Sequence, residues 1–278
     1  MTDVRDAPAS GTEQSGGSAQ GHLIWYELMT PDGDAAKAFY DQVVGWQIGE
    51  PVAEYQGYRM IGRGDGGFAG GVLQLTDEMK QHGARPTWLG YIGVDDADAA
   101  VASIEQAGGK ALMPAFDIPK VGRVAMVTDP QGVPFYVMKP IPPEGQENQQ
   151  SDVFSVDQPQ RVRWNELATD DPDGAIRFYG DQFGWNQEGD MDMGEMGKYR
   201  FIQNRGTTIG AVMKRPPLLP VSKWTYYFGV EDIDRAADAV KSGGGQVVNG
   251  PMEIPGGEFA VNAIDPHGAA FGLVGPRK

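Results

Sequence analysis

The feature that most constrains this chain is a long internal repeat. The run WYELMTPDGDAAKAFYDQVVGW at Trp25–Trp46 returns as WNELATDDPDGAIRFYGDQFGW at Trp164–Trp185. The Trp, Glu, Leu and Thr of the opening run, the Phe-Tyr pair and the final Gly-Trp are identical and equally spaced in the two copies. A repeat of this length indicates duplication of a whole structural unit. The chain is therefore predicted to contain two copies of one fold.

Each copy of the repeat predicts a strand followed by a helix. Residues 25–29 alternate in a way that places their first, third and fifth side chains on one face of a strand. Asp32 or Asp34 is positioned to cap the helix that follows, by accepting from its first free amides. Apolar residues then recur at helical spacing, and Gly45 stands where a left-handed residue would end the helix.

The two halves of the chain each contain two such units. In the first half a second strand opens at Trp88, Asp96 can cap a second helix, and a D-P-Q-G turn at 129–132 precedes the closing strand. Asp265–Gly268 repeats that turn in the second half. We expect a tail at 1–20, a domain at 21–140, a polar linker at 141–160 and a domain at 161–278. The predicted fold is α+β, with each pair of βαβββ modules forming a concave, partly closed sheet.

Composition excludes several classes of function. The net charge of −15 disfavours nucleic acid and anionic membranes as partners, because both need clustered Lys and Arg. The chain has no cysteine, which excludes thiolate metal sites and a cysteine nucleophile. No apolar run approaches the roughly 20 residues of a membrane span. The Ser- and Gly-rich tail lacks the apolar core of a secretory signal, so we expect a disordered tail and a cytoplasmic protein.

The strand followed by D-x-D-A-A-K-A-F-Y and G-W, together with D-P-x-G before each closing strand, resembles the vicinal oxygen chelate superfamily. This group includes glyoxalases, bleomycin-resistance proteins and extradiol dioxygenases. The chain is also similar to the two-domain, glyoxalase-like secreted antigen group of actinobacteria, which share a W-x-[DE]-L opening strand. The resemblance implies two glyoxalase-like domains. It also implies that the fused halves supply the pairing of single-domain relatives, in a monomer or a homodimer.

The resemblance also implies where a divalent metal would bind, through His, Glu or Gln on equivalent strands. These ligand positions fall on residues without imidazole or carboxylate groups: Trp25 and Trp164, Leu89 and Thr225, Tyr136 and Gly272. Hard and borderline cations prefer imidazole and carboxylate. We therefore expect no metal or other cofactor, although a non-standard site using the glutamates with His22 is an alternative. His82 and His267 are expected to be exposed.

Polar residues that both halves keep are better candidates for a site. Glu27 and Glu166 share a strand face with the implied ligand position, and a semi-buried carboxylate needs a partner. Arg59 and Arg200 recur in matched Tyr-Arg-x-Ile runs, so a Glu–Arg pair is expected inside each half. Such a pair either fixes two strands or contacts a ligand. Large aromatic side chains are either core residues or ligand-stacking residues: Trp25, Trp164, Trp88, Trp224 and Tyr136.

Three functions are compatible with these residues. The first is a metal-independent protein similar to bleomycin-resistance proteins, which binds a small organic ligand in the concave sheet. The second is a lyase or isomerase acting on a small carbonyl compound, with Glu27 or Glu166 as a general base of raised pKa. The third is an interaction protein whose barrels are filled and bind no ligand. A Gly-rich run at 62–67 is followed by a strand, so we interpret it as a hairpin loop rather than a phosphate-binding loop.

Overall fold

The structure of the protein, a computed structural model, describes residues 18–142, 144–145 and 150–278. Most of the predicted tail at 1–20 and part of the predicted linker at 141–160 lie outside these residues. Within the described residues the chain forms two eight-stranded sheets, one from each half of the sequence. We call the β1–β8 half domain 1 and the β9–β16 half domain 2.

Domain 1 contains one mixed sheet and three α-helices. Its strands lie in the order β2-β3-β4-β1-β5-β8-β7-β6. The elements are β1 (Leu23–Thr30), α1 (Gly33–Val43), β2 (Gln47–Ile48), β3 (Arg59–Gly62), β4 (Phe68–Gln74), α2 (Asp77–Gln81), β5 (Thr87–Gly93), α3 (Ala97–Gln106), β6 (Lys110–Ile118), β7 (Gly122–Thr128) and β8 (Pro134–Pro140).

Domain 2 repeats this topology in the order β10-β11-β12-β9-β13-β16-β15-β14. Its elements are β9 (Val162–Thr169), α4 (Pro172–Phe183), β10 (Asn186–Asp192), β11 (Lys198–Asn204), β12 (Thr207–Lys214), β13 (Lys223–Gly229), α5 (Ile233–Ser242), β14 (Gln246–Glu253), β15 (Phe259–Ile264) and β16 (Ala270–Gly275). The two α+β domains predicted from the repeat are thus confirmed, but the sheets do not close, since each ends in two edge strands. The connector between β12 and β13 is shorter than its counterpart in domain 1 and has no helix like α2.

The helix ends follow the sequence signals. The Asp32 side chain accepts from the amide of Ala35, so Asp32 rather than Asp34 caps α1. The α4 helix is capped in the same way by Asp171 and ends at Gly184, whose φ of 72° is the left-handed conformation that glycine tolerates. The repeated run therefore positions the same strand and helix in both domains.

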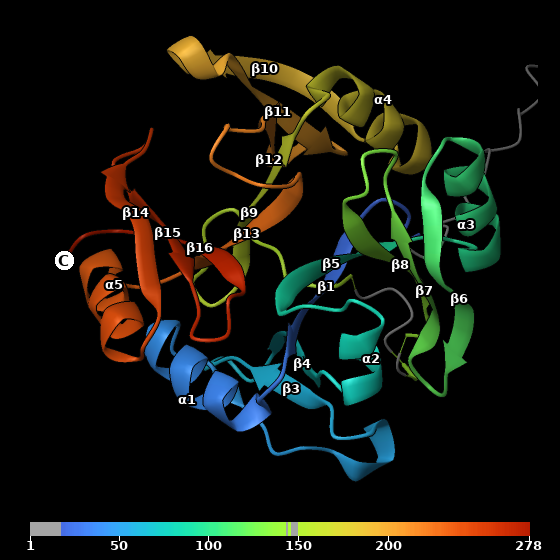
Figure 1. The fold of residues 1–278 in the computed structure, drawn as a ribbon, viewed down its shortest axis with the longest axis horizontal. Coiled ribbons are helices and arrows are strands. Elements are labelled where there is room, and N and C mark those ends of the chain that lie inside the picture. Colours follow the sequence, from blue (N-terminus) through green and yellow to red (C-terminus); the bar gives the residue numbers. More distant parts are fainter. Residues whose placement is uncertain (1–17, 143, 146–149) are drawn as a thin grey trace, which may run out of the picture.

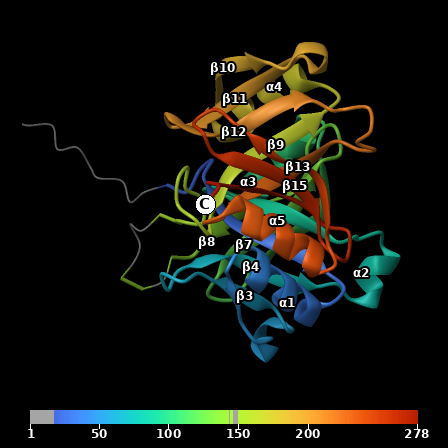
Figure 2. The same cartoon turned by 90° about the vertical axis from the view of Figure 1, so that its left-hand side faces the viewer.

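The two domains share one hydrophobic core that lies between their sheets. The rings of Tyr26 and Tyr226 meet edge to face across the interface, with centroids 5.1 Å apart. The helices of one domain pack beside those of the other, α1 beside α5 and α3 beside α4. Tyr40 of α1 donates to Asp265 of the D-P-H-G turn, 3.1 Å away. Strands β3 and β4 lie at one end of the molecule and β10 and β11 at the other (Figure 2).

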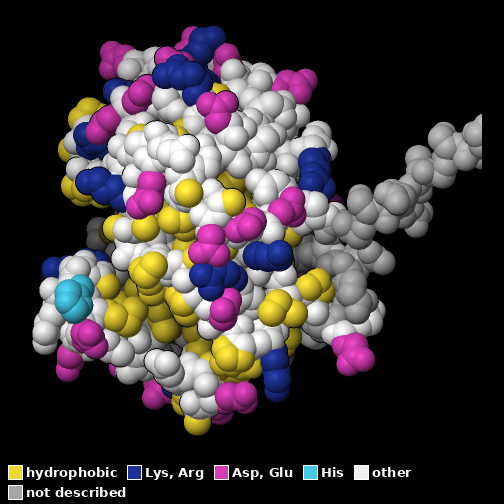
Figure 3. Space-filling model, turned by 90° about the vertical axis from the view of Figure 1, so that its right-hand side faces the viewer, with side chains coloured by type: hydrophobic (Ala, Val, Ile, Leu, Met, Phe, Trp, Pro, Cys, Tyr) yellow, Lys and Arg dark blue, Asp and Glu magenta, His cyan; other side chains and the backbone are white. Residues whose placement is uncertain are grey.

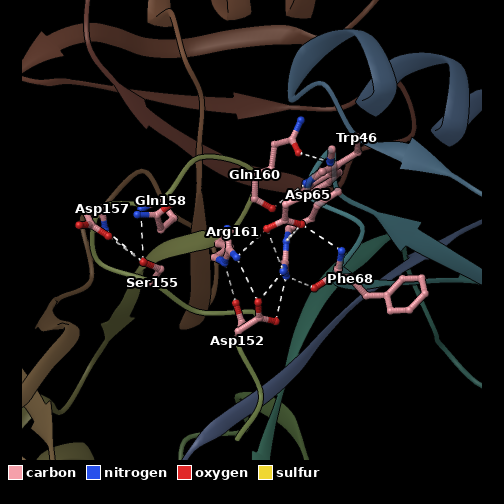
Figure 4. A network of polar contacts seen from close by, with 12 residues as sticks. Trp46, Asp65, Phe68, Asp152, Ser155, Asp157, Gln158, Gln160 and Arg161 are labelled. Carbon is pink, nitrogen blue, oxygen red and sulfur yellow. Dashed lines mark hydrogen bonds and ion pairs between the residues drawn. The ribbon is translucent and has the colours of Figure 1, made fainter. Parts of the chain in front are cut away.

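The Gly-rich run between β3 and β4 forms a hairpin loop, as predicted, and a buried arginine ties it to the interdomain segment. The Arg63 side chain is 2% exposed and bonds Asp65 at 3.1 Å and Asp152 at 2.5 Å. Arg161 binds the same two carboxylates from the other side (Figure 4). The side-chain oxygen of Gln160 accepts from the Gly64 amide at 2.7 Å. Residues 150–161 are therefore held against domain 1 by specific contacts.

Among the described residues, no helix combines the length and the apolar character that crossing a membrane requires.

Candidate functional site

The side of each sheet that faces away from the shared core carries a buried or half-buried glutamate. In domain 1, Glu27 of β1 lies opposite Leu89 of β5, and Trp25 lies opposite Tyr91. Directly paired residues share a face, so these four side chains point together onto the concave side of the sheet. Tyr136 of β8 pairs with Tyr91 and joins them.

Tyrosines surround Glu27. The Tyr91 hydroxyl donates to Oε2 of Glu27 at 2.8 Å, and the Tyr91 ring stacks on Tyr136 with centroids 4.2 Å apart. The Trp25 indole donates to the Tyr58 hydroxyl at 2.8 Å. The Tyr58 ring packs on Gly71 of β4, and a Cβ at position 71 would overlap that ring. Glu27 is 3% exposed, and its Oε1 has no hydrogen-bond partner in the described structure.

Burial dominates the electrostatics of Glu27. Desolvation raises the pKa of its carboxyl to about 7, while the hydroxyls of Tyr91, Tyr136 and Tyr58 favour the charged form and offset part of the rise. Burial and the nearby carboxylate raise the pKa of Tyr91 well above its usual value. The tyrosines therefore remain protonated donors near neutral pH, whereas the raised pKa of Glu27 brings its titration into the neutral range.

Apolar side chains fill the rest of this concave face. They form a second hydrophobic cluster, separate from the shared core, with Met29, Leu89, Val124 and Met138 as buried members. Half-buried residues pack against it from α2, β4, β6 and β7: Met79, Leu73, Met113 and Met126. On the side of the molecule where α2, β6 and β7 lie, hydrophobic side chains gather beside a hollow (Figure 3). Methionine is unbranched and adapts to irregular partners, so this surface can repack around a guest.

Domain 2 presents the same face with more polar groups. Tyr199 donates to Oε2 of Glu166 at 2.7 Å, and Tyr227 donates to Oε1 at 3.3 Å. Asn262 of β15 donates to the Tyr227 hydroxyl at 2.8 Å. Burial raises the pKa of Glu166, and the two tyrosines and Lys223 oppose the rise. Glu166 is half-buried, whereas Glu27 is buried, so Glu166 is the more exposed residue of the two.

Equivalent positions explain the difference between the two faces. The apolar Leu89 and Met126 of domain 1 are replaced by Thr225 and Asn262 in domain 2. Thr225 lies opposite Glu166 as Leu89 lies opposite Glu27. Asn262 lies opposite Gly272 as Met126 lies opposite Tyr136. The ring of Tyr136 is replaced by Gly272, and Tyr227 lies directly over that glycine. Domain 1 therefore has an apolar, methionine-rich face and domain 2 a polar one.

The predicted Glu–Arg pairs do not form. Arg59 bonds Asp34 at 2.6 Å, at the start of α1, and Arg200 bonds the equivalent Asp173 of α4. In each Tyr-Arg run the tyrosine side chain lies on the concave face. The arginine side chain lies on the opposite face, toward the helix, because neighbouring residues of a strand point in opposite directions. Arg59 and Arg200 thus tie a strand to a helix and are not placed to contact a ligand beside the glutamates.

The tryptophans divide in the same way. Trp88 and Trp224 lie in the shared core, where their indoles donate to Tyr40 and Tyr179 of the helices at 2.9 Å. Neither can reach the concave face, so the structure does not support a stacking role for them. Trp25 and Trp164 lie on the concave faces and are half-buried, and Trp164 packs against Tyr199 and Phe201. Their role in ligand binding stays a prediction, as does that of Tyr136.

The residues at the implied metal positions do not fit a divalent cation. Trp25 and Leu89 offer no oxygen or imidazole, and Tyr136 offers only a phenol in place of the imidazole or carboxylate that such cations prefer. Within the described residues, no group of three His, Cys, Asp or Glu side chains lies together.

His82 is exposed as predicted, and His267 is half-buried rather than exposed. His22 is half-buried, and burial lowers the pKa of its ring.

Sequence reasoning missed several polar residues around the glutamates. Tyr91 in domain 1 and Tyr199 in domain 2 donate to the glutamates directly, whereas Tyr58 accepts from Trp25 and Asn262 donates to Tyr227. The signal for two of them was present, because the Tyr-Arg runs repeat the tyrosine as faithfully as the arginine. Alternation shows only that one of two neighbours faces inward, and the sequence alone does not say which.

Comparisons with known proteins match both domains of the chain. The profile of the Glyoxalase/Bleomycin resistance protein/Dioxygenase superfamily matches residues 21–137 and 161–273. Over 260 residues the chain is 34% identical to CFP32 of Mycobacterium tuberculosis, whose name places it among glyoxylases, and the match covers 92% of this chain and 95% of CFP32. It is 31% identical over 271 residues to the anthracycline biosynthesis protein DnrV of Streptomyces peucetius, covering 92% and 94% of the two chains.

Solved structures show the same fold at low sequence identity. The Mn(II)-bound glyoxalase of Novosphingobium aromaticivorans superposes with a TM-score of 0.61 at 18% identity, covering 93% of this chain and 83% of that one. The 2,3-dioxygenase LapB of Pseudomonas sp. KL28 superposes with a TM-score of 0.60 at 12% identity, covering 94% of both chains. At this level of identity the likeness concerns the fold alone.

Proposed function

Because this chain belongs to the glyoxalase/bleomycin resistance protein/dioxygenase superfamily, we propose that it binds a small, flat, mostly apolar organic molecule on the concave face of domain 1. The observation that carries the proposal is the unpartnered Oε1 of Glu27. A buried carboxyl oxygen without a hydrogen bond costs free energy, and a hydroxyl on a bound molecule removes that cost. No metal takes part in the proposed binding.

The surroundings of Glu27 define the class of ligand. The walls are methionine and leucine side chains, and Tyr91, Tyr136 and Trp25 add aromatic surface. Sites of this kind combine a large apolar area with a few polar groups that set orientation. A fused-ring aromatic molecule with a hydroxyl group matches both parts. The resemblance to proteins of anthracycline biosynthesis supports the same class.

A hydroxyanthraquinone serves as the probe for this proposal. We expect calorimetric titration at pH 7 to show one site per chain. The Glu27→Leu variant removes the acceptor while keeping the volume, and hydrogen bonds to charged groups contribute about 1.5–3 kcal/mol, so affinity should fall about 10- to 100-fold. Glu166→Leu is the matched control and should leave the affinity unchanged. Equal loss in both variants, or no binding by the wild type, would count against the proposal.

A second candidate function is proton transfer by Glu27 on a carbonyl compound of the same shape. The observation that favours it is the pKa of about 7, which suits a general base at neutral pH. In D₂O such an enzyme would exchange hydrogen for deuterium at the carbon next to the carbonyl of the bound compound. Glu27→Gln would abolish this exchange without abolishing binding, whereas a binding protein shows no exchange in either form.

A further inference from the structure

Lys223 at the start of β13 is a half-buried lysine whose side-chain amine makes no ion pair and no hydrogen bond within the described part of the chain. Lys37 is also half-buried, but its amine bonds Asp41 at 2.8 Å and the Ile48 carbonyl. An ammonium group that loses water normally gains a partner. The position of Lys223 therefore calls for an explanation.

The sheet register places Lys223 on the concave face of domain 2. Thr225 lies directly opposite Glu166, and Tyr227 donates to that carboxyl. Lys223 precedes Thr225 by two residues, so it has the same facing. Residues at such diagonal positions lie about 7–8 Å apart, a distance that long side chains span. The Lys223 amine can thus reach a molecule that lies over Glu166.

The local electrostatics favour a nucleophilic amine. Burial lowers the pKa of Lys223, and the nearby Glu166 carboxylate only partly opposes this effect. A larger share of the side chain is then unprotonated at neutral pH than for an exposed lysine. Lysines activated in this way by desolvation form Schiff bases with carbonyl compounds.

We propose that Lys223 forms an imine with a small aldehyde or ketone bound on the concave face of domain 2. The amine nitrogen bonds to the carbonyl carbon and gives a carbinolamine. The carbon–oxygen bond then breaks and a carbon–nitrogen double bond forms. The oxygen leaves as water, and the balance of protons is met because the amine nitrogen loses both of its own. Glu166 relays a proton to the departing oxygen and recovers one from the nitrogen, so the only by-product is one water molecule.

Other residues of domain 2 suit an aromatic carbonyl compound. The half-buried rings of Trp164 and Phe201 pack against each other, and Trp164 lies two residues before Glu166 on the same face of β9. Asn262 donates to the Tyr227 hydroxyl, which donates to Glu166. The position equivalent to Lys223 in domain 1 is Thr87, which carries no amine. The reaction is therefore confined to domain 2, and it does not depend on ligand binding at Glu27.

Benzaldehyde with cyanoborohydride at pH 7 tests this proposal, because the reductant converts an imine into a stable benzyl amine. Peptide mapping should show benzylation at Lys223 several-fold faster than at the exposed lysines Lys110, Lys120 and Lys139. Lys37, which is half-buried but paired, should be slower than these. Labelling of Lys223 at or below the rate of the exposed lysines would overturn the proposal.

Two variants separate reactivity at this face from simple exposure of an amine. Glu166→Gln should slow benzylation of Lys223 several-fold and leave the rate at Lys110 unchanged, since glutamine keeps the shape but cannot relay a proton. Glu188→Gln, at an exposed carboxyl of β10, is the control and should change neither rate. If Glu166→Gln has no effect on Lys223, the proposed role of the carboxyl is wrong.

Discussion

The Glu27→Gln variant is expected to be more stable than the wild type above pH 7, although it removes a charged group that a tyrosine binds. The pKa of Glu27 rises from 4.5 in the unfolded chain to about 7 in the folded protein, so the folded state binds the proton more tightly. Stability of the wild type must then fall as pH rises from about 4.5 through 7. Each pKa unit corresponds to 1.36 kcal/mol, which gives a loss of about 3 kcal/mol.

Chemical denaturation at pH 5 and pH 8 measures this effect. Glutamine resembles the protonated carboxyl, so the two proteins should differ little at pH 5 and most at pH 8. Glu166→Gln is the control, with a smaller difference expected because Glu166 is half-buried and two tyrosines hold its charge. A wild type whose stability rises over this range relative to Glu27→Gln would show that Glu27 is held as a carboxylate.

Trp88→Ala is expected to destabilise the protein by about 3–5 kcal/mol, the usual cost of truncating a buried tryptophan. The Trp88 side chain packs on Trp46 and on Phe228 of the other domain, with the Phe228 centroid 4.7 Å away. Its indole also donates to Tyr40. The variant thus loses contacts on both sides of the domain interface and leaves a buried hydroxyl without its donor.

Trp25→Ala is the control for Trp88→Ala. Trp25 occupies the concave face and is half-buried, so its truncation should cost less stability than that of Trp88 and should weaken binding of the hydroxyanthraquinone. Thermal and denaturant unfolding, with titration of the probe, distinguish the two variants. Equal stabilities for Trp88→Ala and the wild type would contradict the assignment of Trp88 to the core.

Much of the fold could be predicted from the repeat because its signals are local. The capping aspartates, the glycine after α4 and the alternation along β1 each depend on a few neighbouring residues, and together they predict paired modules. Whether the sheet closes depends on twist and on edge strands, which local patterns do not encode. The open sheets therefore differ from the partly closed form that was expected.

The site was harder to predict because it depends on register between distant strands. Glu27 and Trp25 were assigned to one face by alternation within a single strand. Their partners Tyr91 and Tyr58 come from other strands, and the ladders contain register shifts, such as the one between Leu23 and Trp25. The choice between Tyr58 and Arg59 depended on this pairing, which explains why arginine was predicted and tyrosine is found.

The most direct test of the proposed site is methyl NMR of the protein labelled at its 12 methionines, titrated with the hydroxyanthraquinone. Met113, Met126 and Met138 belong to the cluster beside Glu27, so their methyl signals should shift and saturate at one equivalent of probe. Met213 and Met252 lie in domain 2 and should remain in place. Shifts confined to the domain 2 methionines, or no shift at all, would contradict binding on the concave face of domain 1.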